Sequence, residues 1–284
     1  MKRLLLRGGG IVLAALAVFA GAALAGAAPL PVGERWVLYP RRVPVSTWSA
    51  HCELSPFVVR ARDGTLLRGW IVRGTRPNAP WTLTFTGNAG TAASMLGIGM
   101  WFARHTGSTT VLWDYRGFGF SEGRPSIAAT RDDALRVYDT MRARSKAELV
   151  VYGHSFGSTI ATRVASARPV RALVLHAAPS SATRLLSDFR DRHFPGFMHR
   201  VRLVPTSTVR EDFDLAREIA SVRAPTIVLH GTADALIPIG EGRAVEAAAG
   251  ARKKRFIALA GVEHPVIDYD TPAGDELAAF LAVI

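Results

Sequence analysis

The pentapeptide at residues 153–157 constrains the fold more than any other part of this chain. It reads Gly-His-Ser-Phe-Gly and stands between an apolar run at 149–152 and a helical pattern at 156–167. In this setting the serine occupies a sharp strand-to-helix turn, with its Oγ exposed above a sheet. Both glycines are needed because a Cβ at either position would collide with the neighbouring strand or helix. The motif alone is weak, and the strand–turn–helix context makes it specific.

Short apolar runs alternate with helical patterns along most of the chain. A hairpin is expected first, over 57–73, because Asp63-Gly64 is a turn signal between two apolar runs. The later strands are expected at 81–85, 109–113, 149–152, 170–175, 226–229 and 255–259. Helical patterns separate most of them, which favours parallel strands joined by right-handed crossovers. The sequence therefore predicts an α/β fold with a mostly parallel central sheet and helices on both faces.

Residues 180–223 interrupt this alternation. They combine large apolar side chains with many arginines. We expect a short helical lid here, inserted after a strand, with ordinary surface helices as the alternative. The apolar side chains are Leu185, Leu186, Phe189, Phe194, Phe197, Met198 and Leu203.

The first 30 residues have the composition of a targeting or anchoring segment. Lys2, Arg3 and Arg7 precede an uncharged stretch at 8–33 whose apolar part is rich in alanine. Its length suits a secretory signal and is close to the roughly 20 residues that span a bilayer. Residues 1–30 are therefore expected to be a signal peptide or an N-terminal membrane anchor. Either one predicts an exported protein, periplasmic, secreted or anchored to a membrane and facing outside the cytoplasm.

The serine needs partners, because a hydroxyl is a weak nucleophile until a base removes its proton. Asp234 and His264 each follow an expected strand, so both should meet Ser155 at the carboxyl edge of the sheet. We predict Ser155 as the nucleophile, His264 as its general base and Asp234 as the carboxylate that orients the imidazole. The alternative acids follow the histidine closely and are Asp268 and Asp270.

An oxyanion formed during acyl transfer has to be met by preorganised donors. One donor is expected to be the backbone N–H of Phe156, the residue after the nucleophile. The second is expected from the glycine-rich loop at 86–90, which follows a strand. Within that loop Asn88 is the predicted donor of the oxyanion hole, and Ala89 is the alternative.

Three linked motifs carry a family resemblance. Residues 86–90 read Thr-Gly-Asn-Ala-Gly, residues 114–126 read Asp-Tyr-Arg-Gly-Phe-Gly-Phe-Ser-Glu-Gly-Arg-Pro-Ser, and residues 153–157 form the serine motif. In this order they resemble the α/β-hydrolase superfamily. The branch with the most similar motifs contains monoacylglycerol lipases, lysophospholipases and serine aminopeptidase-like hydrolases.

The resemblance covers about residues 35–284, and it implies an α/β-hydrolase domain, which we place at 31–284. Two positions depart from the branch. Thr86 stands where the branch usually has a histidine that supports the loop, and Pro265 directly follows the predicted base. The first departure concerns the hydrogen bonding of the loop and leaves the three predicted catalytic residues in place.

The resemblance implies a serine hydrolase of the esterase or lipase type (EC 3.1.1) that cleaves a small-molecule or lipid-derived carboxylic ester through an acyl-enzyme on Ser155. The same residues would serve a peptidase or amidase, and a catalytically silent binding protein on this fold is a further alternative. Membrane association would suit a lipid substrate.

No cofactor and no metal are expected, because no metal-ligand or nucleotide-binding motif occurs. A single cysteine, Cys52, excludes an intrachain disulfide and a cysteine-based zinc site. The formal net charge of +12 comes from scattered arginines without a long basic run. We therefore expect no nucleic-acid partner.

Overall fold

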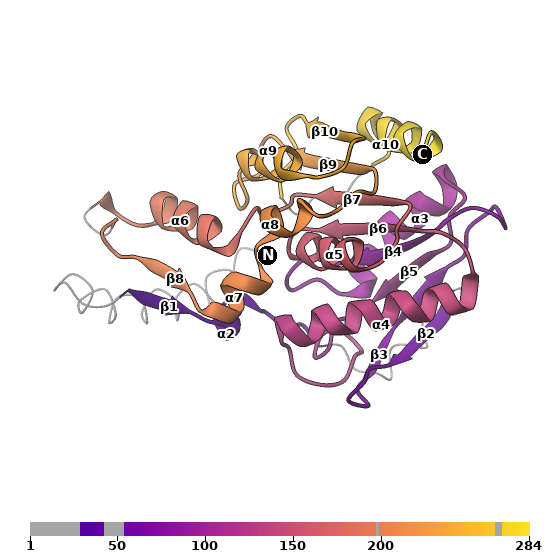
Figure 1. Ribbon diagram of the computed structural model, residues 1–284, viewed down its shortest axis with the longest axis horizontal. Helices are drawn as coiled ribbons and strands as arrows, with labels where there is room; N and C mark the ends of the chain where they lie inside the picture. Colours follow the sequence, from indigo (N-terminus) through magenta and orange to yellow (C-terminus); the bar gives the residue numbers. More distant parts are fainter. Residues whose placement is uncertain (1–28, 43–53, 197–198, 265–268) are drawn as a thin grey trace.

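The computed structural model describes residues 29–42, 54–196, 199–264 and 269–284 (Figure 1). Its central sheet has eight strands: β2 Ser55–Arg60, β3 Leu66–Val72, β4 Trp81–Phe85, β5 Thr110–Trp113, β6 Leu149–His154, β7 Ala172–His176, β9 Thr226–Gly231 and β10 Lys254–Leu259. Their order is β10-β9-β7-β6-β4-β5-β3-β2. Strand β3 pairs antiparallel with β2 and β5, and the other neighbouring strands are parallel. The expected mostly parallel sheet is confirmed.

Helices cover both faces of the sheet (Figure 1). One face carries α4 Ile127–Ser145, α5 Phe156–Ala167, α8 Leu215–Ile219 and α9 Ile239–Ala248, and the other carries α3 Leu96–His105 and α10 Pro272–Ala282. Side chains of a strand alternate between the faces, so Val151 of β6 joins one apolar core while Val150 and Tyr152 join the other. A strand buried on both sides reads as a continuous apolar run, which is why β6 could be recognised in the sequence.

The turn between β6 and α5 is built by close backbone approach. Ser155 lies at positive φ, 53°, with ψ −123°. A Cβ on Gly157 would lie 2.1 Å from the carbonyl oxygen of Phe85, and one on Gly153 would lie 2.5 Å from the carbonyl oxygen of Gly157. The two glycines therefore let β4, β6 and α5 converge, and they leave the serine at the carboxyl end of β6.

Residues 180–223 form an excursion between β7 and β9. It contains α6 Ala182–His193, β8 Leu203–Pro205, α7 Ser207–Asp212 and α8. Strand β8 pairs in parallel with β1 Leu30–Val32, so the start of the described chain lies beside the excursion (Figure 1). The sequence predicted helices here and missed β8, because a three-residue strand paired with a distant segment leaves no local pattern.

Two further helices are short. Helix α2 Glu34–Val37 follows β1, and a 3-10 helix, η2 Ala92–Met95, leads into α3. Glu34 of α2 accepts a hydrogen bond from the backbone N–H of Ile127 at 2.8 Å, so α2 covers the beginning of α4. The N-terminal segment is thus packed against the sheet's helical layer.

The expectation of a transmembrane helix is corrected. No helix within the described ranges is both long and apolar enough to cross a bilayer. Even α4, with 19 residues, carries charged side chains on successive turns, whereas a span needs about 20 predominantly apolar residues. The segment that raised the expectation, residues 1–28, lies outside the described residues. The predictions of membrane association and of an exported, membrane-anchored location are corrected with it.

Replacing Gly157 with alanine should destabilise the protein, because the new methyl group would overlap the backbone of β4. We expect a loss of at least about 2 kcal/mol in the free energy of unfolding, measured by urea denaturation. The matched control is Gly97→Ala on the exposed side of α3, where an added Cβ meets no atom within 4 Å. That change should leave stability equal or higher by up to about 1 kcal/mol. Equal stability of the two variants would contradict the packing described for the turn.

Candidate active site

The structure brings together the three side chains that the sequence singled out. Ser155 follows β6, Asp234 follows β9 and His264 follows β10. The Nε2 atom of His264 lies 3.0 Å from the Oγ of Ser155, and its Nδ1 lies 2.8 Å from an Oδ2 oxygen of Asp234. An imidazole so placed can take a proton from the serine hydroxyl at Nε2, while the carboxylate beside Nδ1 stabilises the imidazolium that forms.

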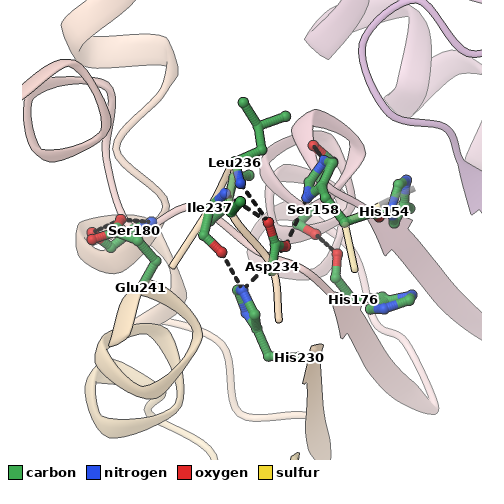
Figure 2. A network of polar contacts seen from close by, with 12 residues as sticks. His154, Ser158, His176, Ser180, His230, Asp234, Leu236, Ile237 and Glu241 are labelled. Carbon is green, nitrogen blue, oxygen red and sulfur yellow. Dashed lines mark hydrogen bonds and ion pairs between the residues drawn. The ribbon is translucent and has the colours of Figure 1, made fainter. Parts of the chain in front are cut away.

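Asp234 is held by its own loop. Its Oδ1 accepts hydrogen bonds from the backbone N–H groups of Leu236 and Ile237, at 2.9 and 2.8 Å (Figure 2). Burial raises the pKa of the carboxyl group, but hydrogen bonds from His230, His264 and the Ile237 N–H outweigh it and hold the pKa well below its usual range. The group is therefore ionised at neutral pH, as a partner of an imidazolium must be.

His230 is a supporting residue that the sequence analysis did not identify. It is fully buried at the end of β9 and its Nε2–H donates to the carbonyl oxygen of Ile237 at 2.8 Å. The same nitrogen lies 3.5 Å from Asp234 Oδ2, and Figure 2 shows the ring directly beneath the carboxylate. Its position four residues before Asp234 was the available signal.

The two predicted oxyanion donors lie in the loop after β4 and at the start of α5. A Cβ on Gly87 would lie 3.3 Å from the Cβ of Ser155, so this loop runs directly beside the serine. Within the described part of the chain no group accepts a hydrogen bond from the backbone N–H of Asn88 or of Phe156. The N–H of Ala89, the alternative donor, is directed to the side chain of Asn88 at 3.0 Å.

The side chain of Asn88 also anchors the loop. Its Oδ1 accepts from the backbone N–H of Tyr39 at 2.9 Å, and its Nδ2 donates to the carbonyl oxygen of Val37. The loop is therefore tied to the segment that follows α2, nearly fifty residues earlier in the sequence. At the position of the branch histidine, the carbonyl of Thr86 accepts a hydrogen bond from the hydroxyl of Tyr115 at 2.8 Å.

The segment at 114–126 shapes the neighbourhood without reaching the serine. Asp114 is fully buried, and its two oxygens accept from the N–H groups of Ala92 and Phe120 at 2.7 and 3.0 Å. Burial raises the pKa of Asp114 to about 6, although both hydrogen bonds act to lower it. Gly119 lies at positive φ beside it, where a Cβ would come within 2.1 Å of the carboxyl carbon.

The remaining candidates lie elsewhere. Asp270 pairs with Arg104 and His105 of α3, at 3.1 and 3.2 Å. Asp268, Pro265 and Cys52 are outside the described residues. Across the described ranges, no group of three or more His, Cys, Asp or Glu side chains is arranged to hold a metal ion.

Comparisons with known proteins agree with this architecture. Residues 83–214 match a family model described as the alpha/beta hydrolase fold. An uncharacterised protein of Mycobacterium tuberculosis is 30% identical over 237 residues, which cover 81% of this chain and 80% of that protein. The lysophosphatidylserine lipase ABHD12 of Rattus norvegicus is 30% identical over 190 residues, or 61% of this chain and 46% of the relative.

Solved structures show the same fold. The Pyrococcus furiosus esterase Pf2001 superposes with a TM-score of 0.66 at 16% identity, over 86% of this chain and 99% of the esterase. The monoacylglycerol lipase of Paleococcus ferrophilus superposes with a TM-score of 0.55 at 18% identity, over 75% of this chain and 96% of the lipase. Taken with the sequence relatives, these matches support an enzyme of the hydrolase class.

The pKa of Asp114 predicts a pH-dependent contribution to stability. In the unfolded chain an aspartic acid has a pKa of about 3.9, and in the folded protein burial raises the value to about 6. Between these values the native state holds a proton that the unfolded state has released, so raising the pH through this window lowers the stability. As the pH is raised from 4 to 7.5, the free energy of unfolding of the neutral Asp114→Asn variant should therefore rise by about 1–3 kcal/mol relative to that of the wild type. Urea denaturation at each pH measures this difference. A stability difference that is constant with pH would contradict the assignment.

Proposed function

The chain belongs to the α/β-hydrolase superfamily, and from this premise we propose that it is a serine hydrolase that cleaves carboxylic esters through an acyl-enzyme on Ser155. The observation that carries the proposal is the hydrogen-bonded series from Ser155 through His264 to the ionised Asp234. Catalytic serine, base and acid need this connectivity, because the base must receive the proton and the acid must stabilise the resulting imidazolium.

The reaction follows from these positions. The Oγ of Ser155 attacks the ester carbonyl while Nε2 of His264 takes its proton. Negative charge then develops on the carbonyl oxygen, where the N–H groups of Phe156 and Asn88 and the positive end of α5 would stabilise it. His264 returns the proton to the departing alcohol, and the same base then activates the water that hydrolyses the acyl-enzyme.

The proteins that this chain resembles support an ester, and in particular a lipid-derived one, as the substrate. The relatives and structural neighbours include a lysophosphatidylserine lipase, an esterase and a monoacylglycerol lipase. His264 can protonate a departing alcohol or a departing amine. Hydrolysis of amides by the same three residues is an outcome that the substrate panel below distinguishes.

We also propose that residues 31–284 form one catalytic domain in which 180–223 serves as the lid. Phe213 of the excursion stacks on Phe156, with ring centroids 5.8 Å apart. Arg192 of α6 donates from Nη2 to the carbonyl oxygen of Leu236 at 3.0 Å, two residues after Asp234. The excursion thus contacts both the start of α5 and the loop of the acid.

Replacing Ser155 with alanine should reduce kcat by about 10³-fold or more and abolish labelling by a fluorophosphonate probe, because among the described residues Ser155 supplies the hydroxyl that hydrogen-bonds to His264 Nε2. His264→Ala and Asp234→Asn should also lower kcat, and their double mutants with Ser155→Ala should lose no more. Activity is measured on a panel of acyl esters, lysophospholipids and aminoacyl amides.

The control for this experiment is Ser166→Ala on α5, whose hydroxyl bonds to Arg163 and Glu218. It should keep full activity and labelling. Half of the wild-type rate remaining in Ser155→Ala would contradict the nucleophile assignment, and faster turnover of the amides than of the esters would make the enzyme a peptidase or amidase.

Asn88 provides a separate test of the oxyanion loop. Asn88→Asp keeps the acceptor for Tyr39 N–H but replaces the donor to Val37 with a charged oxygen, so the loop should shift and kcat should fall by about 10-fold or more at nearly constant KM. The control is Asn78→Ala, an exposed asparagine before the start of β4, and it should change neither constant. Unchanged kcat in Asn88→Asp would contradict the role of the loop.

A further inference from the structure

Two buried imidazoles that the hydrolytic steps do not use lie next to the serine turn. His154 ends β6 and His176 ends β7, and the two residues are partners in the parallel register. Their rings are 5.1 Å apart in an edge-to-face arrangement, and the side chains are 7% and 1% exposed. An imidazole buried in this way requires a structural or functional reason, because its polar nitrogens have to be satisfied.

His176 connects the serine turn to Tyr269. Its carbonyl oxygen accepts from the backbone N–H of Ser155 at 2.8 Å, so the main chain of β7 supports the turn. Its Nδ1 forms a hydrogen bond of 2.9 Å with the hydroxyl of Tyr269. One residue therefore bonds to the nucleophile through its main chain and, through its side chain, to a residue five positions after the predicted base.

Tyr269 is fixed on every side. Its hydroxyl also forms a hydrogen bond with the hydroxyl of Tyr152 of β6, with the oxygens 3.0 Å apart. Its carbonyl oxygen accepts from the indole Nε1–H of Trp101 on α3 at 2.9 Å. With only 3% of its surface exposed, Tyr269 is held between β7 and α3 by these contacts.

His154 supports the backbone of His264. Its Nε2 lies 3.2 Å from the carbonyl oxygen of His264, and the two rings are 5.3 Å apart. On the opposite edge, a Cβ on Gly87 would lie 3.0 Å from Nδ1 of His154. The ring is therefore confined between the loop of Asn88 and the backbone of His264, with a position set by both.

Both rings are neutral at neutral pH. Burial, followed by the neighbouring His264, lowers the pKa of His154 to about 4, and burial lowers the pKa of His176 well below its usual range. A neutral ring has one donor and one acceptor nitrogen. A carbonyl oxygen can only accept, so His154 donates to the carbonyl of His264 through Nε2–H, and Nδ1 of His176 forms a hydrogen bond with the hydroxyl of Tyr269.

From this arrangement, and resting on the serine-hydrolase function proposed above, we propose that His154, His176 and Tyr269 are positioning residues that set the distance between His264 and Ser155. They touch neither the substrate nor the transferred proton. His154 acts through the backbone of the base, and His176, held by Tyr269, acts through the backbone of the nucleophile. A shift of about 1 Å between two reacting groups can lower a rate by about 100-fold, so a contact of modest strength can have a large effect on turnover.

The test compares two tyrosines of the same cluster in the full-length protein. Tyr269→Phe deletes the hydroxyl that lies 2.9 Å from His176 Nδ1, whereas Tyr152→Phe deletes a hydroxyl that bonds to Tyr269 and lies farther, 3.4 Å, from the same nitrogen. Both remove one buried oxygen and keep the ring. We expect Tyr269→Phe to lower kcat by about 10-fold or more with KM within about twofold, and to slow fluorophosphonate labelling of Ser155 to the same degree. We expect Tyr152→Phe to stay within about threefold of the wild type in both measurements.

A second pair of variants tests the hydrogen bond between His154 and the carbonyl oxygen of His264. His154→Gln can still donate an N–H to the carbonyl oxygen of His264, and it should retain most of the activity. His154→Phe fills similar space without a donor, and it should lose about as much kcat as Tyr269→Phe. Thermal unfolding of all four variants separates positioning from folding, because a purely structural role would lower the melting temperature together with the activity in each.

Wild-type kcat in both Tyr269→Phe and His154→Phe would overturn the inference while leaving the proposed function intact. Equal losses in Tyr269→Phe and Tyr152→Phe that follow the melting temperature would overturn it as well. If the unsubstituted protein neither labels at Ser155 nor turns over any ester, the proposed function fails, and the inference fails with it.

Discussion

The close approach of α5 to β4 is the constraint on which the rest of the arrangement depends. The carbonyl oxygen of Phe85 occupies the space that a side chain at residue 157 would need. This close approach accompanies the sharp turn after β6, in which Ser155 lies at positive φ. Because the strand registers on either side are set by the sheet, the loops after β4, β9 and β10 then meet at the same place. A single packing contact thus determines where the polar residues of the site can gather.

The electrostatics of the two buried aspartates differ because only one of them has imidazole neighbours. Asp234 and Asp114 are both largely buried, and each accepts two backbone N–H bonds. Only Asp234 also faces imidazoles, and these lower its pKa, whereas burial dominates at Asp114 and raises the pKa to about 6. At the carboxyl edge of the same sheet, one aspartate is therefore an ionised partner of His264 and the other is a structural element of a loop.

Much of this could be predicted from the sequence, and the reasons are physical. The strands are buried on both faces, so they read as apolar runs, and the turn at 153–157 needs glycines that stand out by their spacing. The Ser, Asp and His that the sequence singled out each follow such a run. The contacts that were missed join residues with no local pattern, such as Asn88 with Val37 and Tyr39, β1 with β8, and Tyr269 with His176. The membrane-spanning expectation was drawn from the length, composition and flanking charges of the N-terminal stretch, and residues 1–28 lie outside the described residues.

The loop that carries Asp234 is supported from two independent parts of the fold. From within, the buried ring of His230 donates to the carbonyl of Ile237. From outside, α6 reaches over the loop, where Arg192 hydrogen-bonds to Leu236.

The beginning of α6 is itself anchored in the interior. The N–H and the hydroxyl of Ser180 both donate to Glu241 of α9, at 2.8 and 2.7 Å (Figure 2). Arg184 pairs with the second oxygen of this fully buried carboxylate. A buried charge is tolerated only when such partners surround it, so α6 cannot leave α9 without exposing or stranding Glu241. The geometry of the acid therefore depends on the excursion as well as on the sheet, although the excursion contributes none of the three side chains.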